Sequence, residues 1–418
     1  MAGLGACSAG SSGPRTAADG GWVSPPRVDT RELTVLIKVE PPAKLRELFE
    51  AMAERAGDDS VASFFLGHSA GSYGSGFIVA RQASPRPMVF VVTNRHVVDL
   101  AERVSIVLES GATYGDAEIV YVDRRYDLAV LAFPEARAVP VAYGFPLASE
   151  PVRDQQAVTA TGFPALGGKP SYRTTKGYVS NERFELDDEG GETRRFIQHT
   201  APIGPGSSGG PLTTEGGRLV GVNTLKILDS DSAYVAVPVA AVADAVRAAV
   251  ELRSRRAQDG WRRRALNDAC RALVAELGSD EPKPKRLEGA IASSMVGERG
   301  AESFSFVAGR DEELWELFRT DPVDAIRWSI VRRLWGEVRA GGGVRAARSC
   351  EGVGDEASAL AGDAVSMPIG LGDGVRRLSW RFEQGRWKVS DVEFRRMVEA
   401  PALPPKPGKK KAGRKGKR

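Results

Sequence analysis

The sequence predicts a mainly β domain that is followed by a helical region and then an α+β region. Short apolar runs of four to seven residues recur from residue 61 to about 238, separated by Gly, Pro and Asp/Arg turns. Many short strands at regular spacing are typical of an all-β barrel or sandwich. No helical pattern separates these runs, which disfavours a parallel α/β sheet.

Two elements are expected before this region, a strand over residues 31–40 and a helix over 43–56. The helix is indicated by the spacing of four apolar residues, Leu45, Leu48, Phe49 and Met52. The apolar runs that we expect to form strands are 61–66, 76–80, 88–92, 104–108, 118–122, 128–133, 157–161 and 219–224.

After Pro238 the pattern turns helical, with Gly260 dividing residues 239–277 into two expected helices. Asp321-Pro322 is a typical helix start, with Asp as the cap and Pro at the first helical position. The apolar stripe of this helix is Val323, Ile326, Ile330, Leu334 and Val338. Residues 375–394 predict a hairpin, in which Leu378, Trp380 and Phe382 alternate before a Gln384-Gly385 turn.

These patterns divide the chain into five predicted parts. They are a disordered leader (1–30), a β domain (31–245, with its motifs in 61–245), a helical connector (246–286), a small α+β domain (287–398) and a basic disordered tail (399–418).

The charge of the chain is concentrated in its last residues. Residues 404–418 hold eight Lys/Arg and no acid, so the other residues carry a formal net charge of −4 against +4 for the whole chain. Such a tail is most often a solvated charge run, and the less common alternative is non-specific attraction to nucleic acid or an anionic surface. No stretch approaches the roughly 18 to 20 apolar residues that span a bilayer.

The three cysteines, Cys7, Cys270 and Cys350, are odd in number and widely spaced. This pattern argues against a disulfide-stapled scaffold and offers no zinc-binding spacing. Leu4-Gly5-Ala6-Cys7 resembles the lipobox of bacterial lipoproteins, although only three residues precede it. Either the true start lies upstream or the match is chance. We expect the cell envelope or periplasm rather than the cytoplasm as the location.

Three local patterns in the β region carry candidate chemistry. Val91-Val-Thr-Asn-Arg-His-Val-Val98 places His96 at a strand end, Tyr126-Asp-Leu-Ala-Val-Leu131 places Asp127 before a strand, and Gly204-Pro-Gly-Ser-Ser-Gly-Gly-Pro-Leu212 presents Ser208. A serine hydroxyl is a poor nucleophile without a base, and histidine oriented by aspartate supplies one. Together the three residues predict a catalytic triad for acyl transfer.

The glycines around Ser208 indicate how charge on the reacting carbonyl oxygen would be stabilised. Glycine permits tight turns that aim backbone N–H groups at one point. We expect the amides of Gly206 and Ser208 to form this oxyanion hole, and Gly209 and Gly210 to leave room for a substrate.

On these motifs the chain resembles a trypsin-like (chymotrypsin-fold) serine peptidase, closest to the HtrA/Deg type. TNRHVV and DLAVL resemble the histidine and aspartate motifs of that family, and Gly74-Ser-Gly-Phe-Ile-Val79 resembles the strand before the histidine. Segments 161–164 and 176–180 resemble two strands of its second barrel, 197–212 resembles its active-site segment, and 219–225 resembles the pocket strand that follows. The resemblance implies two six-stranded antiparallel β-barrels.

The chain departs from the family pattern at several positions. Ser207 stands before the nucleophile, where the family usually has Asn and digestive members have Asp, which argues against activation by a newly cleaved N-terminus. His199 replaces a small polar residue, and we expect a structural role for it and for His68. The segment after residue 239 does not resemble a PDZ domain.

The resemblance also places the substrate pocket. Pro202 occupies the position where peptidases that cut after Arg or Lys carry an acid, so specificity for basic residues is not expected. The expected walls are Asn223, Thr224, Leu225, Val235 and Ala236. These walls suggest that the pocket accepts a small or medium apolar side chain of the substrate.

The sequence therefore predicts a serine endopeptidase that cuts unfolded or extended polypeptide, with no metal or cofactor implied. The alternative is a peptidase-like binding or scaffold protein that recognises a partner through its C-terminal domain. The oligomeric state cannot be predicted.

Overall fold

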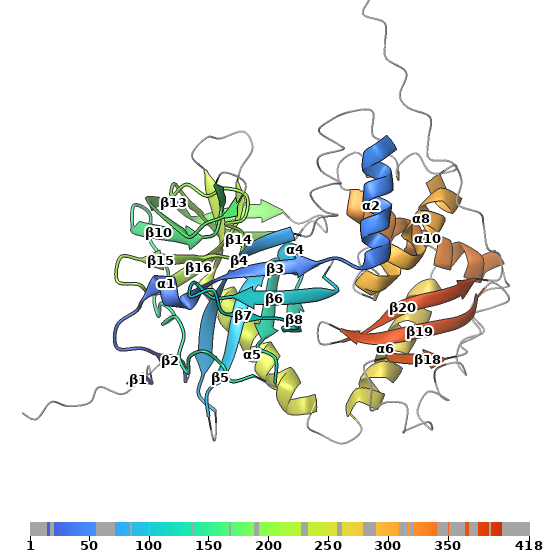
Figure 1. Cartoon of the computed structure of the whole chain (residues 1–418), viewed down its shortest axis with the longest axis horizontal. Helices are drawn as coiled ribbons and strands as arrows, with labels where there is room; N and C mark the ends of the chain where they lie inside the picture. The colour runs from blue at the N-terminus through green and yellow to red at the C-terminus, as the bar shows by residue number, and fades with distance from the viewer. Residues whose placement is uncertain are drawn as a thin grey trace, which may run out of the picture. The chain divides into compact units, whose positions relative to one another are not determined.

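The structure is a computed structural model, shown in Figure 1 with the chain coloured from blue to red. It describes residues 15–16, 21–55, 72–83, 86–99, 101–135, 137–166, 169–187, 192–226, 233–256, 261–278, 290–308, 314, 317, 322–340, 350, 364–367, 375–383 and 386–394. These residues belong to two compact units. Unit 1 comprises 1–39, 73–99 and 103–255, and unit 2 comprises 40–72, 100–102 and 256–418.

The first half of unit 1 is a seven-stranded sheet in the order β7-β6-β3-β4-β5-β9-β8. Its strands are β3 (Thr34–Glu40), β4 (Ser72–Arg81), β5 (Met88–Asn94), β6 (Arg103–Val107), β7 (Thr113–Tyr114), β8 (Glu118–Asp123) and β9 (Leu128–Ala132). Apolar residues face the core on β5 and β9, where Phe90, Val92, Val130 and Leu131 are fully buried.

The second half of unit 1 is a closed barrel in the order β10-β13-β14-β17-β16-β15. Its strands are β10 (Ala157–Gly162), β13 (Arg173–Asp187), β14 (Thr193–His199), β15 (Pro211–Thr214), β16 (Leu219–Lys226) and β17 (Tyr234–Pro238), all paired antiparallel. Its core includes Val158, Val179, Ile197, Leu212 and Val220. Helix α5 (Val239–Arg256) follows β17 directly.

The predicted mainly β architecture with antiparallel strands is confirmed. The second barrel has the expected six strands, whereas the first half is a curled sheet of seven. The strand expected over 31–40 forms as β3 and lies between β6 and β4, whereas the two-residue β7 at the edge of the sheet was not predicted. The expected strand at 61–66 lies outside the described residues.

Unit 1 also contains two small hairpins and, before the first sheet strand, one helical turn. They are β1 (Arg15–Thr16) with β2 (Val23–Ser24), β11 (Ala165–Leu166) with β12 (Lys169–Pro170), and α1 (Thr30–Leu33). Asp29 caps α1 by accepting hydrogen bonds from the Arg31 and Glu32 amides.

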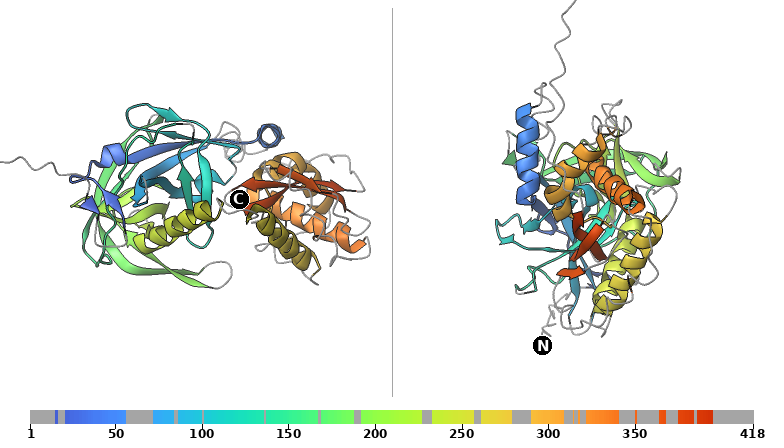
Figure 2. Two further views of the ribbon diagram at one scale, coloured as in Figure 1. Left: turned by 90° about the horizontal axis from the view of Figure 1, so that it is seen from below. Right: turned by 90° about the vertical axis from the view of Figure 1, so that its right-hand side faces the viewer.

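Unit 2 packs helices against a three-stranded sheet (Figure 2). Its elements are α2 (Ala43–Arg55), α6 (Trp261–Leu277), α8 (Ser293–Ala308), α10 (Pro322–Ala340), β18 (Ala364–Met367), β19 (Val375–Glu383) and β20 (Arg386–Phe394). The two helices expected on either side of Gly260, the helix start at Pro322 and the hairpin over 375–394 all form.

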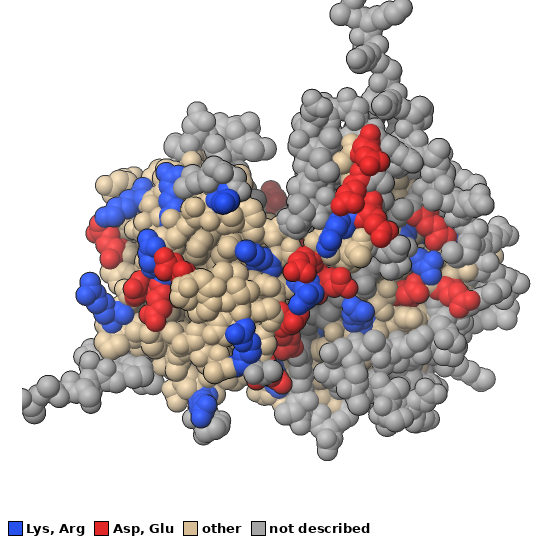
Figure 3. All heavy atoms as spheres, in the orientation of Figure 1, with Lys and Arg blue, Asp and Glu red and all other residues tan. Residues whose placement is uncertain are grey.

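Helix α2 belongs to the core of unit 2, although we grouped residues 43–56 with the β domain from the sequence. Leu45 and Phe49 are fully buried in a cluster that also contains Leu273, Ile330 and Trp380. On the face seen in Figure 3, acidic side chains gather over α2, which exposes Glu47, Glu50 and Glu54. Elsewhere on the described part of that face, acidic and basic side chains are interspersed.

Two of the three cysteines form one disulfide, which the expectation that the chain is not a disulfide-stapled scaffold did not foresee. Cys270 on α6 and Cys350 are bonded with their Cα atoms 6.0 Å apart and a sequence separation of 80 residues. Spacing argues against a dense disulfide framework but does not exclude one long-range bond, because folding brings distant cysteines together. Cys7 lies outside the described residues.

Candidate active site

His96 and Asp127 meet because they follow the paired strands β5 and β9 at the same edge of the sheet. Asn94, the last residue of β5, is opposite Leu128, the first residue of β9. His96 therefore lies two residues beyond one strand, in the short helix α4 (Arg95–Val98), and Asp127 lies one residue before the other. Asp127 adopts the left-handed conformation with φ of 53°, which short polar side chains tolerate.

The Asp127 carboxylate holds the imidazole of His96. Its Oδ2 lies 2.5 Å from Nδ1 of the ring, and its Oδ1 accepts a 3.0 Å hydrogen bond from the His96 backbone N–H. An ionised carboxylate can only accept, so Nδ1 carries the proton. Nε2 is thereby left as the basic nitrogen.

Further groups fix Asp127 in turn. Its backbone carbonyl accepts hydrogen bonds from the Asn94 side chain at 3.0 Å and from the Arg95 amide at 2.9 Å. The Thr224 hydroxyl donates to Oδ2 at 3.3 Å, and the Arg95 guanidinium lies 3.5 Å from Oδ1. Three residues thus hold Asp127: Thr224 and Arg95 contact its carboxylate, and Asn94 and Arg95 bind its backbone carbonyl. Of these only Thr224 was expected at the site, and in a different role.

The loop that carries Ser208 is folded by consecutive turns. The Ser207 amide donates to the Gly204 carbonyl at 2.9 Å, and the Gly210 amide donates to the Ser207 carbonyl at 3.0 Å. Gly206 and Gly209 both have positive φ, at 94° and 84°. A Cβ at Gly206 would lie 2.6 Å from the Phe163 carbonyl oxygen, so this position has room for glycine alone.

The amides expected to form the oxyanion hole have no acceptor within the described part of the chain. Neither the Gly206 N–H nor the Ser208 N–H donates a hydrogen bond there. Half-buried amides normally have partners, so two amides without an acceptor in the same loop are available to a ligand, as the predicted oxyanion hole requires.

The Ser208 hydroxyl donates to the Thr224 carbonyl at 3.2 Å. Among the described residues no hydrogen bond links it to His96. Thr224 therefore touches both sides of the site, through its hydroxyl to Asp127 and through its carbonyl to Ser208.

The residues expected to line a substrate pocket separate in the structure. Pro202 lines a cavity of about 150 Å³ together with Thr161, Pro164, Arg173 and Ile203, and Thr224 lines a different one of about 380 Å³ beside His96. Asn223, Val235 and Ala236 are fully buried and line neither cavity. The side chain of Leu225 lies outside the described residues.

The cavity beside His96 has an aromatic and cationic wall. Tyr126 and Phe196 meet edge to face with ring centroids 5.7 Å apart, and Arg95 and Arg125 complete the lining with His96, Asp127 and Thr224.

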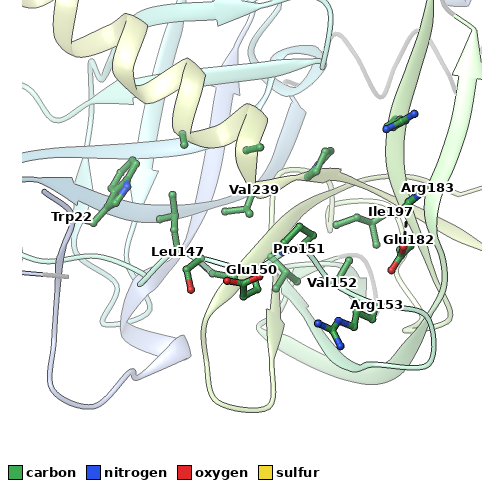
Figure 4. Close-up of a pocket in the computed structure, with 17 residues that line it drawn as sticks. Trp22, Leu147, Glu150, Pro151, Val152, Arg153, Glu182, Arg183, Ile197 and Val239 are labelled. Carbon is green, nitrogen blue, oxygen red and sulfur yellow. Dashed lines mark ion pairs between the residues drawn. The ribbon is translucent and has the colours of Figure 1, made fainter. Parts of the chain in front are cut away.

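A larger cavity of about 870 Å³ lies elsewhere in unit 1 (Figure 4). Its wall combines Trp22, the segment 147–153, parts of β13 and β14, and the first turns of α5. Charges of both signs, such as Glu150 and Arg153, surround apolar residues such as Ile197 and Val239. None of the predicted site residues lines it.

His199 is fully buried at the end of β14, and its ring stacks on Tyr234 with centroids 5.9 Å apart. Burial lowers the pKa of this imidazole to about 4, because the charged form loses its hydration. The other histidine given a structural role, His68, lies outside the described residues.

Among the described residues, no group of three or more His, Cys, Asp or Glu side chains could hold a metal ion. None of the described helices is long and apolar enough to cross a membrane.

Comparison with known families assigns the region that contains this site. Residues 74–222 match the family model for the trypsin-like peptidase domain. These residues form a trypsin-like peptidase domain.

Several curated proteins resemble the peptidase domain and its surroundings. A "Serine protease Do-like HtrA" from Lactobacillus helveticus is 32% identical over 174 residues, which cover 42% of this chain and 41% of that protein. A "Probable periplasmic serine endoprotease DegP-like" from Brucella suis is 31% identical over 241 residues, or 56% and 43% of the two chains. A "Serine protease Do-like HtrA" from Bacillus subtilis is 36% identical over 162 residues, or 38% and 34%.

The chain thus spans less than half the length of each of these relatives. Among solved structures, a protease from M. tuberculosis in its active form aligns with a TM-score of 0.38 at 23% identity, over 52% of this chain and 81% of that one.

Proposed function

We propose that the protein is a serine endopeptidase that cuts unfolded or extended polypeptide, with Ser208 as nucleophile, His96 as base and Asp127 as the residue that orients the base. The observation that carries this proposal is the 2.5 Å contact between Asp127 and Nδ1 of His96. It leaves Nε2 as the proton acceptor in a domain whose Ser208 loop also has two open amides, those of Gly206 and Ser208.

In the proposed reaction, Nε2 of His96 takes the hydroxyl proton while the Ser208 oxygen adds to the substrate carbonyl. The resulting oxyanion accepts hydrogen bonds from the Gly206 and Ser208 amides. His96 then gives its proton to the leaving amine as the C–N bond breaks, which leaves an ester on Ser208. Water, deprotonated by His96, cleaves this ester by the same steps and returns the proton to the serine oxygen.

The reaction requires a rotation of the Ser208 side chain. Its hydroxyl now donates to the Thr224 carbonyl, and a turn about the Cα–Cβ bond to another staggered position would redirect the proton. The same hydrogen bond is the one observation that favours the alternative function, a peptidase-like scaffold that binds a partner without cutting it.

We propose a small or medium apolar side chain for the substrate residue that precedes the cleaved bond. Pro202 and Ile203 in the cavity of about 150 Å³ support an apolar side chain, and Arg173 in the same wall disfavours a basic one.

We propose the cell envelope or periplasm as the location. The disulfide between Cys270 and Cys350 supports it, because such bonds persist in oxidising compartments and are rare in the cytosol. The Brucella relative is named periplasmic. Alkylation of free thiols in cells quenched with acid measures the oxidised fraction, and reduced cysteines in the folded protein would contradict this location.

A fluorophosphonate probe tests the activity without knowledge of the substrate. We expect the folded protein to be labelled at neutral pH, Ser208→Ala to lose all labelling, and Ser207→Ala to retain it as the neighbouring-serine control. Degradation of reduced, carboxymethylated casein should follow the same order. Absence of labelling in folded wild-type protein would favour the scaffold function.

A further inference from the structure

Ser75 is a fully buried residue of β4 that contacts the active-site loop from the first sheet. Its hydroxyl donates to the Gly206 carbonyl at 2.6 Å, and its backbone N–H donates to the Ser208 carbonyl at 2.8 Å. One residue thus binds two carbonyls of the loop, on either side of Ser207.

The direction of the Ser75 hydroxyl is fixed by a third group. The Phe163 amide donates to the Ser75 oxygen at 2.8 Å, so the single hydroxyl proton is left for the Gly206 carbonyl. The Ser75 carbonyl in turn accepts a 2.7 Å hydrogen bond from the hydroxyl of Thr93 on β5. Every polar atom of Ser75 therefore has a partner, and none is available to a substrate.

These contacts fix the peptide group between Gly206 and Ser207 at both ends. Its oxygen is held by Ser75, and its N–H donates to the Gly204 carbonyl at 2.9 Å. Glycine would otherwise allow this peptide to rotate, because it has no Cβ to restrict φ and ψ. The Gly206 N–H belongs to the preceding peptide, whose oxygen, the Pro205 carbonyl, accepts a 3.1 Å hydrogen bond from the Ala165 amide. Ser75 therefore holds one of the two peptides that meet at Gly206, and this restricts the φ and ψ angles through which the Gly206 amide could turn.

The surrounding glycines leave the space that this arrangement needs. A Cβ at Gly162 would lie 2.7 Å from the Ser75 hydroxyl oxygen, and a Cβ at Gly209 would lie 2.2 Å from the Ser75 carbonyl oxygen. Larger residues at either position would displace Ser75 or the loop.

We propose that Ser75 is a positioning residue of the oxyanion hole: it holds the peptide that follows Gly206, while Ala165 holds the peptide that precedes it, so that the Gly206 amide faces the reacting carbonyl. This role rests on the proposed peptidase function. Ser75 itself touches neither substrate nor the base.

The test is the second-order rate of labelling by a fluorophosphonate probe, measured on the full chain with Ser75→Ala. Removal of one oxyanion donor costs about a hundredfold to a thousandfold in rate, so a donor that is retained but poorly aimed should cost about tenfold to a hundredfold. On a peptide substrate kcat should fall by that factor while KM stays unchanged. Inhibition by a peptide aldehyde, which forms a tetrahedral adduct, should weaken in the same proportion.

Thr34→Val is the matched control. Thr34 is also fully buried in unit 1, and its hydroxyl donates to the Thr30 carbonyl at 2.6 Å, outside the active-site loop. A general loss of stability would lower the labelling rate of both variants, whereas loss of positioning should lower the labelling rate of Ser75→Ala alone. Equal labelling rates for Ser75→Ala and wild type, or a rise in KM alone, would overturn the positioning role.

If Ser75→Ala does not fold, Thr93→Val tests the same proposal. It removes the hydroxyl that anchors the Ser75 carbonyl, and we expect a decrease of about threefold to tenfold in kcat with unchanged KM. An unchanged kcat would overturn the proposal. A folded wild-type protein that is never labelled would overturn the peptidase function, and Ser75 would lose its role with it, whereas normal labelling of the variants refutes Ser75 alone.

Discussion

The buried His199 should make the second barrel less stable in mild acid. Burial holds its pKa at about 4 in the folded state, against an ordinary value of 6.5 that the unfolded chain recovers. At a pH between these two pKa values, the imidazole is protonated in the unfolded state but not in the folded state, so a decrease in pH favours unfolding. Stability is retained above about pH 6.5 and falls as the pH decreases towards 4, below which both states are protonated.

The size of this effect follows from the two pKa values. The difference between 6.5 and about 4, at about 1.4 kcal/mol for each pH unit, gives about 3 kcal/mol. The imidazole is fully buried, so solvent screening does not reduce this figure by much. His199→Phe keeps an aromatic ring beside Tyr234 and removes the titration, which makes it the matched variant.

The assay is urea-dependent hydrogen exchange, read by mass spectrometry on peptides from β14 and β17. These strands pair at His199 and Tyr234, so the signal reports the second barrel and not unit 2. Titration of other groups is common to both proteins and cancels in the difference. The wild-type free energy of unfolding should fall relative to His199→Phe by about 3 kcal/mol between pH 7 and pH 4. A difference that stays constant over this range would refute the reasoning.

Three further predictions concern the site and unit 2. Asp127→Asn should lower the labelling rate by about 10³- to 10⁴-fold because an amide can hold His96 in the wrong tautomer, with circular dichroism unchanged; an unaltered rate would contradict the assignment. Gly209→Ala should destabilise unit 1 by at least about 2 kcal/mol, because φ is 84° and the new Cβ would lie 2.2 Å from a carbonyl oxygen. Gly216→Ala is the control, because its Cβ would meet nothing closer than 3.7 Å, and it should change the free energy of unfolding by less than about 0.5 kcal/mol. Equal losses of stability in the two variants would exclude the steric explanation for Gly209. Cys270→Ala should cost unit 2 about 4 kcal/mol, since the disulfide spans 80 residues, and should leave labelling intact; an unchanged denaturation midpoint for unit 2 would show that the bond does not stabilise it.

The residues that carry local motifs could be predicted from the sequence, and the residues that hold them could not. His96, Asp127 and Ser208 each sit in a short pattern with its own signature of strand ends and glycines. Thr224 and Ser75 act on partners 97 and 131 residues away. A hydroxyl that binds a distant carbonyl leaves no periodicity or spacing that sequence analysis can detect.

The same limit applies to the cores. The spacing of Leu45 and Phe49 correctly indicates an amphipathic helix, but it does not say which core the apolar face will join. In the structure both residues pack with residues from 266 to 394. Likewise, apolar alternation predicts strands but not their order, so the placement of β3 between β6 and β4 could not be foreseen.

The tetrapeptide Thr93-Asn94-Arg95-His96 connects all parts of the site. Thr93 binds Ser75, which holds the oxyanion loop, and the Asn94 side chain and Arg95 amide both bind the Asp127 carbonyl. The last residue of the four is His96, the proposed base. The strand end therefore sets the position of His96, of Asp127 and, through Ser75, of the loop that carries Ser208.

This arrangement explains why the site can be assembled from two separate sheets. The proposed base and carboxylate, His96 and Asp127, come from the first sheet, whereas the proposed nucleophile Ser208 and the two open amides come from the loop before β15 in the closed barrel. A shift of one sheet against the other would misalign the Ser208 hydroxyl and Nε2 of His96. The hydrogen bonds from Ser75 to the carbonyls of Gly206 and Ser208 oppose that shift, so the contact that orients the oxyanion hole also holds the nucleophile in register with its base.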